Sequence, residues 1–181
     1  MSNSTLRFVA VLFVTVLAGI GAKAQTSGTT TLNVKLNDAL SITVNDPTVL
    51  LQFVTTADYQ NGVSVTMPSH LTVSSNQAYT LNVKTAAATL AGTGANVATL
   101  NASIVSVQLD NPVAQALGGT ANTVNSLSST NQPILSSATA VINKNVNIKY
   151  AIPSSVSSTS QVLGKPADTY STTVTYTISN N

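Results

Sequence analysis

Few residues in this chain have side chains that could catalyse a reaction, and they are scattered along it. His70 is the only histidine, cysteine is absent, and the five acidic residues are all aspartates. General acid–base catalysis needs two titratable groups held close together, and aspartates spread between turns supply few such pairs. Ser69 beside His70 does not form a triad by adjacency, and no G-x-S-x-G motif is present to expose a nucleophile. The sequence therefore predicts a protein that is not an enzyme and has no catalytic residues.

Patterns for binding metals, cofactors or sugars are equally sparse. Zinc sites need clustered cysteine and histidine, and calcium loops need several carboxylates close together in the sequence. Tryptophan, which commonly stacks on sugar rings, is absent. The aromatic residues after position 24 lie in strand patterns, Tyr59 excepted, so we expect them to pack in the protein. We therefore predict no metal site and no cofactor, and we expect His70 to be a surface residue or a satisfied core residue.

The first 24 residues have the pattern of a secretory signal peptide. Arg7 precedes an apolar run that begins at Phe8, and the stretch closes on Ala22-Lys23-Ala24. A charged start, a short apolar centre and a small-x-small ending are the features that a signal peptidase recognises. The apolar run is too short to anchor the chain in a bilayer. We therefore predict cleavage before Gln25, export, and no stable membrane span in the mature protein.

Cleavage at this point would leave a chain without net charge. Of the seven basic residues, Arg7 and Lys23 would be lost, and the remaining five lysines balance the five aspartates. A neutral chain without a basic patch is not expected to bind nucleic acid. Because cysteine is absent, stability must come from burial, backbone pairing or a partner chain. A neutral surface also has little electrostatic repulsion, which favours association with other chains.

Most apolar residues of the predicted mature chain alternate with polar ones, which is the period of a β-strand. The alternation is clear over 32–36 and 40–44. Asn61-Gly62 between two apolar segments is a strong signal for a two-residue hairpin turn. Further strands are predicted over 49–56, 63–67, 70–73, 79–84, 102–109, 138–142, 146–152 and 170–178. In the last of these we expect Val174, Tyr176 and Ile178 to face the core of a central strand.

One short helix is predicted after residue 110. Asn111 can cap it, Pro112 suits its first turn, and Gly118-Gly119 can end it in the left-handed conformation. About ten short strands and one helical turn predict an all-β fold, an antiparallel Ig-like β-sandwich. The segments 85–97 and 118–132 are predicted to be long surface loops. Since apolar alternation resumes on both sides of each loop, residues 25–181 are predicted to form a single domain.

The two ends of the predicted mature chain carry the strongest functional signal. Gly28, Leu32, Val34 and Leu36 lie on one side of an N-terminal strand pattern behind a polar lead, and the chain closes on the strand pattern with Val174, Tyr176 and Ile178. These patterns resemble those of bacterial fimbrial subunits assembled by a chaperone and an usher, and of spore-coat-U-like secreted β-sandwiches. The resemblance implies that residues 25–36 are donated as a strand that completes the sandwich of a neighbouring subunit, a form of β-augmentation.

The same resemblance implies partners and a location for the protein. The partners would be further copies of this chain or related surface subunits, together with a periplasmic chaperone and an outer-membrane usher. The location would be the periplasm in transit and then the cell surface, as part of a fimbrium. One alternative stays open: Leu32, Val34 and Leu36 belong to the first strand of a self-complete sandwich, which serves as a non-catalytic secreted binding or adhesion module.

Overall fold

In the computed structural model of this protein, residues 25–94 and 97–181 are described, and almost all of their regular structure is antiparallel β-sheet. The prediction of an all-β sandwich is confirmed. Contacts divide the chain into two units at Leu36 and Asn37. We call residues 37–181 the body and the described part of the first unit, residues 25–36, the extension. The predicted signal peptide lies outside the described residues.

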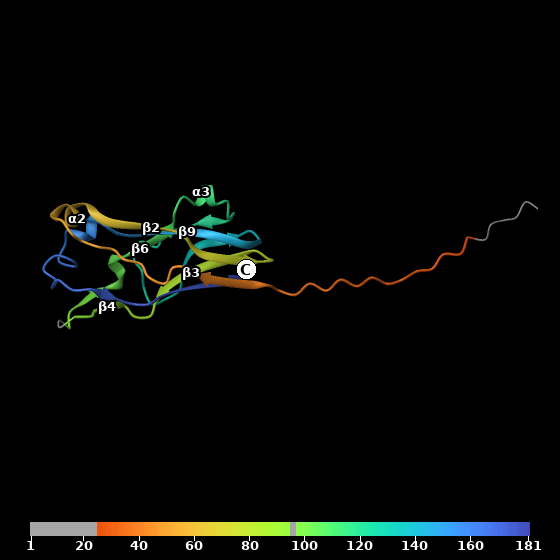
Figure 1. Ribbon diagram of the computed structural model, residues 1–181, viewed down its shortest axis with the longest axis horizontal. Coiled ribbons are helices and arrows are strands. Elements are labelled where there is room, and N and C mark those ends of the chain that lie inside the picture. The colour runs from red at the N-terminus through yellow and green to blue at the C-terminus, as the bar shows by residue number, and fades with distance from the viewer. Residues whose placement is uncertain (1–24, 95–96) are drawn as a thin grey trace, which may run out of the picture. The chain divides into compact units, whose positions relative to one another are not determined.

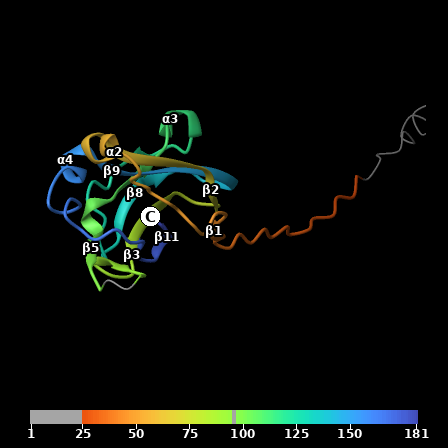
Figure 2. The same cartoon turned by 60° about the vertical axis from the view of Figure 1, so that its left-hand side comes forward.

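The strands of the body form three antiparallel sheets. The first sheet has the order β1 (Leu40–Val44), β2 (Gly62–Ser75), β9 (Val141–Pro153) and β6 (Ser106–Leu109). The second has the order β11 (Val174–Asn180), β3 (Tyr79–Thr85), β8 (Gln132–Ala138) and β7 (Thr120–Ala121). The third has the order β10 (Tyr170–Ser171), β4 (Thr89–Gly92) and β5 (Thr99–Asn101). Figures 1 and 2 show these sheets layered around a common interior.

The helices are short. Those among the described residues are α2 (Thr56–Asn61), α3 (Pro112–Gln115), α4 (Ser154–Ser157) and the 3-10 turn η1 (Ala102–Ile104). The predicted helix is α3, and the side chain of Asn111 caps it by accepting a hydrogen bond from the backbone N–H of Ala114. It ends earlier than expected, because Ala116 already adopts the left-handed conformation. The α2 and α4 turns were not predicted.

The long pair of β2 and β9 forms the centre of the first sheet, and the two strands lie side by side in Figure 1. The predicted strands 63–67 and 70–73 are one strand interrupted by a bulge between Met67 and Leu71. Pro68 lies in this bulge, where a missing backbone N–H breaks no ladder hydrogen bond. Ser69 has a positive φ of 51°, and both His70 and Leu71 are buried although they are neighbours in the sequence.

Several predicted elements differ in the structure. Asn61-Gly62 is not a hairpin turn, because Asn61 ends α2 and Gly62 caps that helix. The predicted strand over 49–56 does not form, because residues 49–54 belong to no strand and Thr56 begins α2. Segment 102–109 begins as η1, and segment 138–142 spans the gap between β8 and β9. The two predicted loops each contain short strands, β4 in the first and β7 in the second.

The hydrophobic core lies between the first and second sheets. Its largest fully buried side chains come from β2, β3, β6, β8 and β9 and from the segments that join them; they are Tyr79, Leu71, Leu81, Ile104, Leu117, Ile134, Leu135, Ile148, Val73, Val83, Val107 and Val146. All buried hydrophobic residues lie between Leu71 and Tyr176. Among the described residues, the fully buried core is therefore assembled without the extension, and the first strand of the body adds only the partly buried Ile42.

Candidate functional site

The predicted interface residues of the extension are exposed. Leu32, Val34 and Leu36 expose 85%, 76% and 85% of their surface. Residues 25–36 are assigned to neither helix nor strand, and a side chain added at Gly28 would meet nothing within 4 Å. The predicted strand over 32–36 is therefore absent from the structure, although its alternating apolar side is intact in the sequence.

The predicted interface residues of the C-terminal strand lie in β11. Tyr176 is buried, and Val174 and Ile178 pack partly buried against the core. Thr173 and Thr175 are exposed and Thr177 is half-buried, so the predicted faces of this strand are confirmed. The prediction that the strand is central is wrong, because β11 pairs only with β3 and ends the second sheet. Its other side pairs with no strand among the described residues, although β1 lies near it.

A second open edge lies in a segment that the sequence predicted as an ordinary strand. Residues 46–53, called here the open segment, belong to no helix or strand, and within the described part of the chain their backbone makes no hydrogen bond. Unpaired backbone groups are uncommon next to a protein core, because each N–H and C=O needs a partner. The open segment therefore runs beside the core without a backbone hydrogen-bond partner among the described residues.

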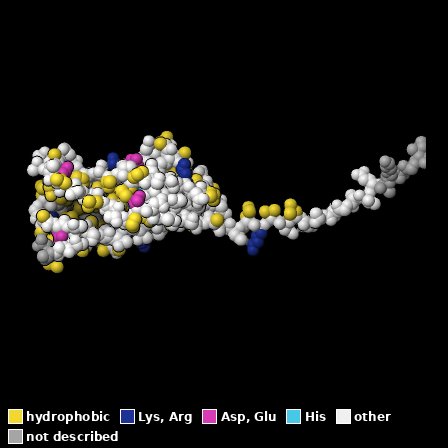
Figure 3. Space-filling view, in the orientation of Figure 1, with side chains coloured by type: hydrophobic (Ala, Val, Ile, Leu, Met, Phe, Trp, Pro, Cys, Tyr) yellow, Lys and Arg dark blue, Asp and Glu magenta, His cyan; other side chains and the backbone are white. Residues whose placement is uncertain are grey.

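The side chains of the open segment alternate as they would in a sheet. Val49, Leu51 and Phe53 pack against the core, whereas Leu50 and nearby Val54 expose 63% and 72% of their surfaces. A cavity of about 420 Å³ lies between this segment and the first residues of β2, lined by Leu50, Leu51, Gln52, Asp58, Gly62, Val63, Ser64 and Val65. Figure 3 shows hydrophobic side chains gathered in a hollow on the half of the body that carries α2 and β4.

Both ends of the open segment are fixed. At one end Asn45 donates its backbone N–H to the carbonyl of His70 (2.9 Å), and its side chain donates to the carbonyl of Ser69 and to Thr72 Oγ1. At the other end the carboxylate of Asp58 accepts the backbone N–H groups of Thr55 and Val54. These backbone bonds hold the pKa of Asp58 below its usual value. The open segment is therefore held by hydrogen bonds at both ends and unpaired between them.

The first sheet also has an unpaired strand edge near the open segment. Strand β1 pairs with β2 only from Leu71 to Ser75, so the outer edge of β2 from Gly62 to Met67 has no strand partner within the described residues. A free strand edge of this kind is a template for another strand. The arrangement can accept an extended peptide whose backbone pairs with an edge and whose apolar side chains cover the hollow.

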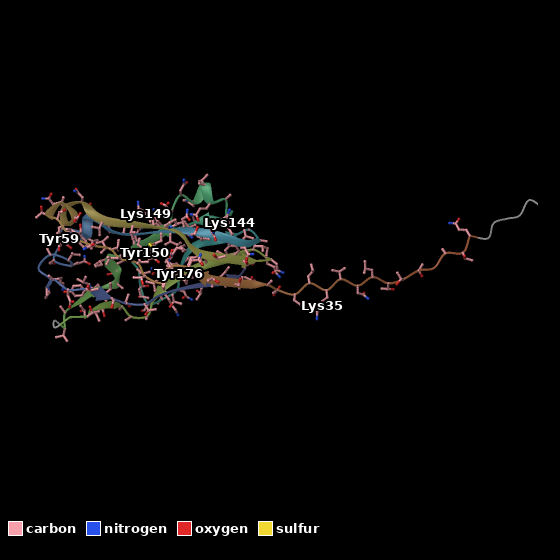
Figure 4. All side chains as sticks on the ribbon, in the orientation of Figure 1. Lys35, Tyr59, Lys144, Lys149, Tyr150 and Tyr176 are labelled. Carbon is pink, nitrogen blue, oxygen red and sulfur yellow. The ribbon has the colours of Figure 1, made fainter. Side chains whose placement is uncertain are left out.

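His70 lies inside the sandwich, as a satisfied or partly satisfied core residue. It is 2% exposed, its Nε2 lies 3.0 Å from the hydroxyl of Tyr150, and that hydroxyl contacts the hydroxyl of Tyr176 at 2.5 Å. Figure 4 shows Tyr150 and Tyr176 together within the body. Burial lowers the pKa of His70, raises the pKa of Tyr150 to about 12 and raises that of Tyr176. The cluster joins β2, β9 and β11 across the two sheets.

Among residues 25–94 and 97–181, no group of three or more histidine or acidic side chains is placed to hold a metal ion. The open segment was missed by the sequence interpretation, because its alternation is that of a paired strand. The signal that could have found it is local: Asp46-Pro47 opens the segment, and Thr55 begins a capping box after it. A proline at the start and a helix cap at the end separate the segment from β1 and from α2.

Neither a scan against models of protein families nor a search of curated proteins finds a match to this chain. In the part of the chain that the structure describes, no helix has the length and apolar character needed to cross a membrane. The function must therefore be inferred from the geometry of the open segment, the β11 edge and the extension.

Proposed function

We propose that this protein is a structural subunit of a bacterial fimbria or cell-surface fibre that assembles by β-strand complementation. The extension of one copy enters the open side of the next copy. There its backbone pairs with free strand edges, and Leu32, Val34 and Leu36 cover the hollow beside the open segment. Main-chain hydrogen bonds supply affinity in such pairing, and alternate side chains supply specificity.

The open segment is the observation that carries this proposal. A segment held at both ends, with alternate apolar side chains packed against the core and no backbone partner among the described residues, can be completed by an added strand. The extension offers the missing part: an unpaired stretch with three exposed aliphatic side chains at every second position. Burying each of those side chains would contribute about 1.5 to 3 kcal/mol.

The geometry of the chain favours donation to a second copy over insertion into the same copy. If the extension reversed at residues 37–39, Leu36 would lie opposite Leu40 and Leu32 opposite Val44. Only the polar residues from Gln25 to Thr30 would then reach the open segment. A second copy has no such restriction, so its apolar residues can meet the hollow.

Further partners and the cell-surface location belong to the same proposal. A subunit with an incomplete sheet needs a partner that covers the open edges before assembly, because exposed edges promote unspecific pairing. A periplasmic chaperone and an outer-membrane usher would serve this purpose during export. Their involvement is supported by the resemblance of the chain's two ends to those of fimbrial subunits.

One observation favours the alternative, a non-catalytic binding or adhesion module with a self-complete sandwich. Every buried hydrophobic residue lies from Leu71 onward, so the body already contains its core. A body that is stable alone does not require a donated strand in order to fold. The two functions therefore differ in whether copies associate through the extension.

The test compares the chain 25–181 with the body 37–181 by size-exclusion chromatography and thermal melting. We expect the longer chain to form multimers and the body to remain a folded monomer, because deletion removes only exposed side chains of the extension. Val34→Asp in the longer chain should abolish multimers. Asn33→Asp, on the opposite side of the strand pattern, should reduce them far less. A longer chain that stays monomeric at all concentrations would refute the proposal and favour the self-complete module.

A further inference from the structure

The point where the extension joins the body is held by the turn between β2 and β3. Asn76 accepts the backbone N–H of Ala39 on its Oδ1 (2.9 Å) and donates its Nδ2 to the carbonyl of Asn37 (2.9 Å). Its own backbone N–H donates to the carbonyl of Ala39 (3.1 Å). The side-chain amide of Gln77 donates to Asp38 Oδ1. Two side chains thus hold three consecutive residues, which we call the junction (37–39).

The turn that holds the junction is itself well anchored. Ser75, which is buried, donates its hydroxyl to the carbonyl of Gln77 (2.7 Å) and accepts the backbone N–H of the same residue (3.2 Å). The backbone N–H of Asn181 donates to the carbonyl of Ala78 (3.1 Å). Because both sides of the turn are fixed, Asn76 and Gln77 can restrain the junction and are not merely carried along by it.

The junction lies at the centre of a hairpin pattern. Leu32, Val34 and Leu36 precede it, and Leu40, Ile42 and Val44 follow it with the same spacing. Strand β1 pairs with β2 on one side only, and Leu40 and Val44 are exposed. The extension could therefore fold back on β1 of its own copy and bury the same side chains that assembly needs.

Two features of the junction oppose this fold-back. A two-residue turn at Asn37-Asp38 would place Val34 opposite Ser41 and so mix apolar and polar faces. The matching register needs a three-residue loop whose last residue is left-handed, a conformation that favours glycine, and the chain has Ala39 there. Ala39 does not have a positive φ in the structure, and its N–H and C=O are both bonded to Asn76.

We infer that Asn76 and Gln77 act as a lock that keeps the junction extended and thereby commits the extension to a second copy of this chain. Asn76 is a positioning residue in this role, because it acts on the extension through residues 37–39. The inference rests on the proposed assembly by strand donation. It adds that the choice between a closed monomer and an assembled fibre is made at the junction, away from the open segment.

The test uses two variants of the chain 25–181 that weaken the lock by different routes. Asn76→Ala removes both side-chain bonds to the junction, and Ala39→Gly supplies the residue that the hairpin loop needs. We expect each variant to raise the monomer fraction by about tenfold relative to the unmodified chain, since the loss of two hydrogen bonds in Asn76→Ala and the relief of left-handed strain in Ala39→Gly are both modest effects. Asn122→Ala is the matched control: Asn122 also donates its amide to a carbonyl and to a hydroxyl, but away from the junction.

Trypsin treatment of the isolated monomers tests whether Asn76 keeps the extension from folding back or only supports the body. Lys35 is the only basic residue between Gln25 and Lys84, so cleavage at Lys35 reports whether the extension is covered. The monomer of the unmodified chain should lose residues 25–35 rapidly. Monomers of Asn76→Ala and Ala39→Gly should resist cleavage at Lys35 and melt at a higher temperature, because the extension is folded back.

Each other outcome overturns the inference in a recognisable way. If the unmodified chain and both variants form multimers equally, the lock is refuted and strand donation stands. If the Asn76→Ala monomer is cut at Lys35 as fast as the unmodified monomer, Asn76 only supports the body and the lock is refuted. If the unmodified chain forms no multimers, strand donation itself fails and the lock fails with it.

Discussion

At the scale of single residues, the cluster of His70, Tyr150 and Tyr176 is the most constrained polar group of the body. One nitrogen of His70 contacts the hydroxyl of Tyr150, whereas Nδ1 has no hydrogen-bond partner among the described residues. The rings of Tyr150 and Tyr176 meet the imidazole edge-on, with centroids 5.7 and 5.8 Å away. A charged imidazolium in this place would be poorly solvated, so the neutral form is favoured in the folded state.

This preference predicts a loss of stability in mild acid. Burial lowers the pKa of His70 below 6.5, and the nearby carboxylate of Asp46 opposes this only in part. As the pH falls below about 6.5, His70 is therefore protonated in the unfolded chain before it is protonated in the folded chain. The free energy of unfolding should be highest above about pH 6.5 and should fall as the pH drops below it, by at most about 1.4 kcal/mol per pH unit.

Urea unfolding of the body at several pH values between about 7.5 and 5 measures this effect. His70→Gln keeps an amide that can bond to Tyr150 but does not titrate, so its stability should change much less over the same range. Asp58→Asn is the control: the pKa of Asp58 is lowered from 3.8, and its contribution is lost only at more acidic pH. Equal pH dependence of the His70→Gln variant and the unmodified body would show that another group is responsible.

At the scale of elements, Gly62 decides how α2 passes into β2. Its φ is +79°, and a Cβ at this position would collide with the carbonyl oxygen of Ile152 and would lie 2.8 Å from the backbone nitrogen of Ser154. Only glycine avoids both the unfavourable backbone conformation and the collision. The residue therefore lets the helix end directly against the last residue of β9, Pro153, with which Gly62 pairs.

Gly62→Ala is therefore predicted to be strongly destabilising. We expect a loss of roughly 2 kcal/mol or more, because strain in the left-handed region adds to displacement of the β9 backbone. Gly164→Ala is a matched control, since Gly164 has the same φ of +79° with nothing within 4 Å of an added Cβ. It should cost about 1 kcal/mol. Thermal melts that show equal losses for the two variants would contradict the role given to the collision with β9.

At the scale of the whole molecule, the described chain has no net charge. Between Gln25 and Asn181 the chain has five lysines and five aspartates. The extension contains a single charged residue, Lys35. The surfaces that are proposed to meet in assembly are backbone edges and aliphatic side chains. Long-range attraction between charges therefore contributes little to the proposed association.

Assembly of the chain 25–181 should accordingly be insensitive to salt. Raising the ionic strength from about 0.1 M to about 1 M shortens the screening length from about 10 Å to about 3 Å. We expect the fraction of multimers in size-exclusion chromatography to change by less than about twofold, since few charged pairs are available to screen. Dissociation of the multimers at high salt would indicate that charge pairing, through Lys35 for example, dominates the contact.

The sequence by itself determined the features that depend on neighbouring residues. Period-two alternation predicted the all-β fold and the inward side of β11, because the pleat sends successive side chains to opposite faces. The Asn111-Pro112 pair predicted α3, because capping and a fixed φ are local properties. The sequence also shows that Ser69 is the only potential nucleophile next to His70 and that no acidic residue adjoins it.

The tertiary structure decided which edges find partners. Segment 49–54 and β11 both carry strand alternation, yet one remains unpaired and the other ends a sheet. Asn61-Gly62 reads locally as a hairpin, but Thr55 and Asp58 form a capping box and turn the preceding residues into α2. Alternation shows that a segment suits a sheet, whereas pairing depends on residues distant in the sequence. The ends of the open segment, the hydrogen bonds of Asn76 and Gln77 to the junction and the buried His70 cluster all depend on such distant contacts. Only the folded chain brings these residues together.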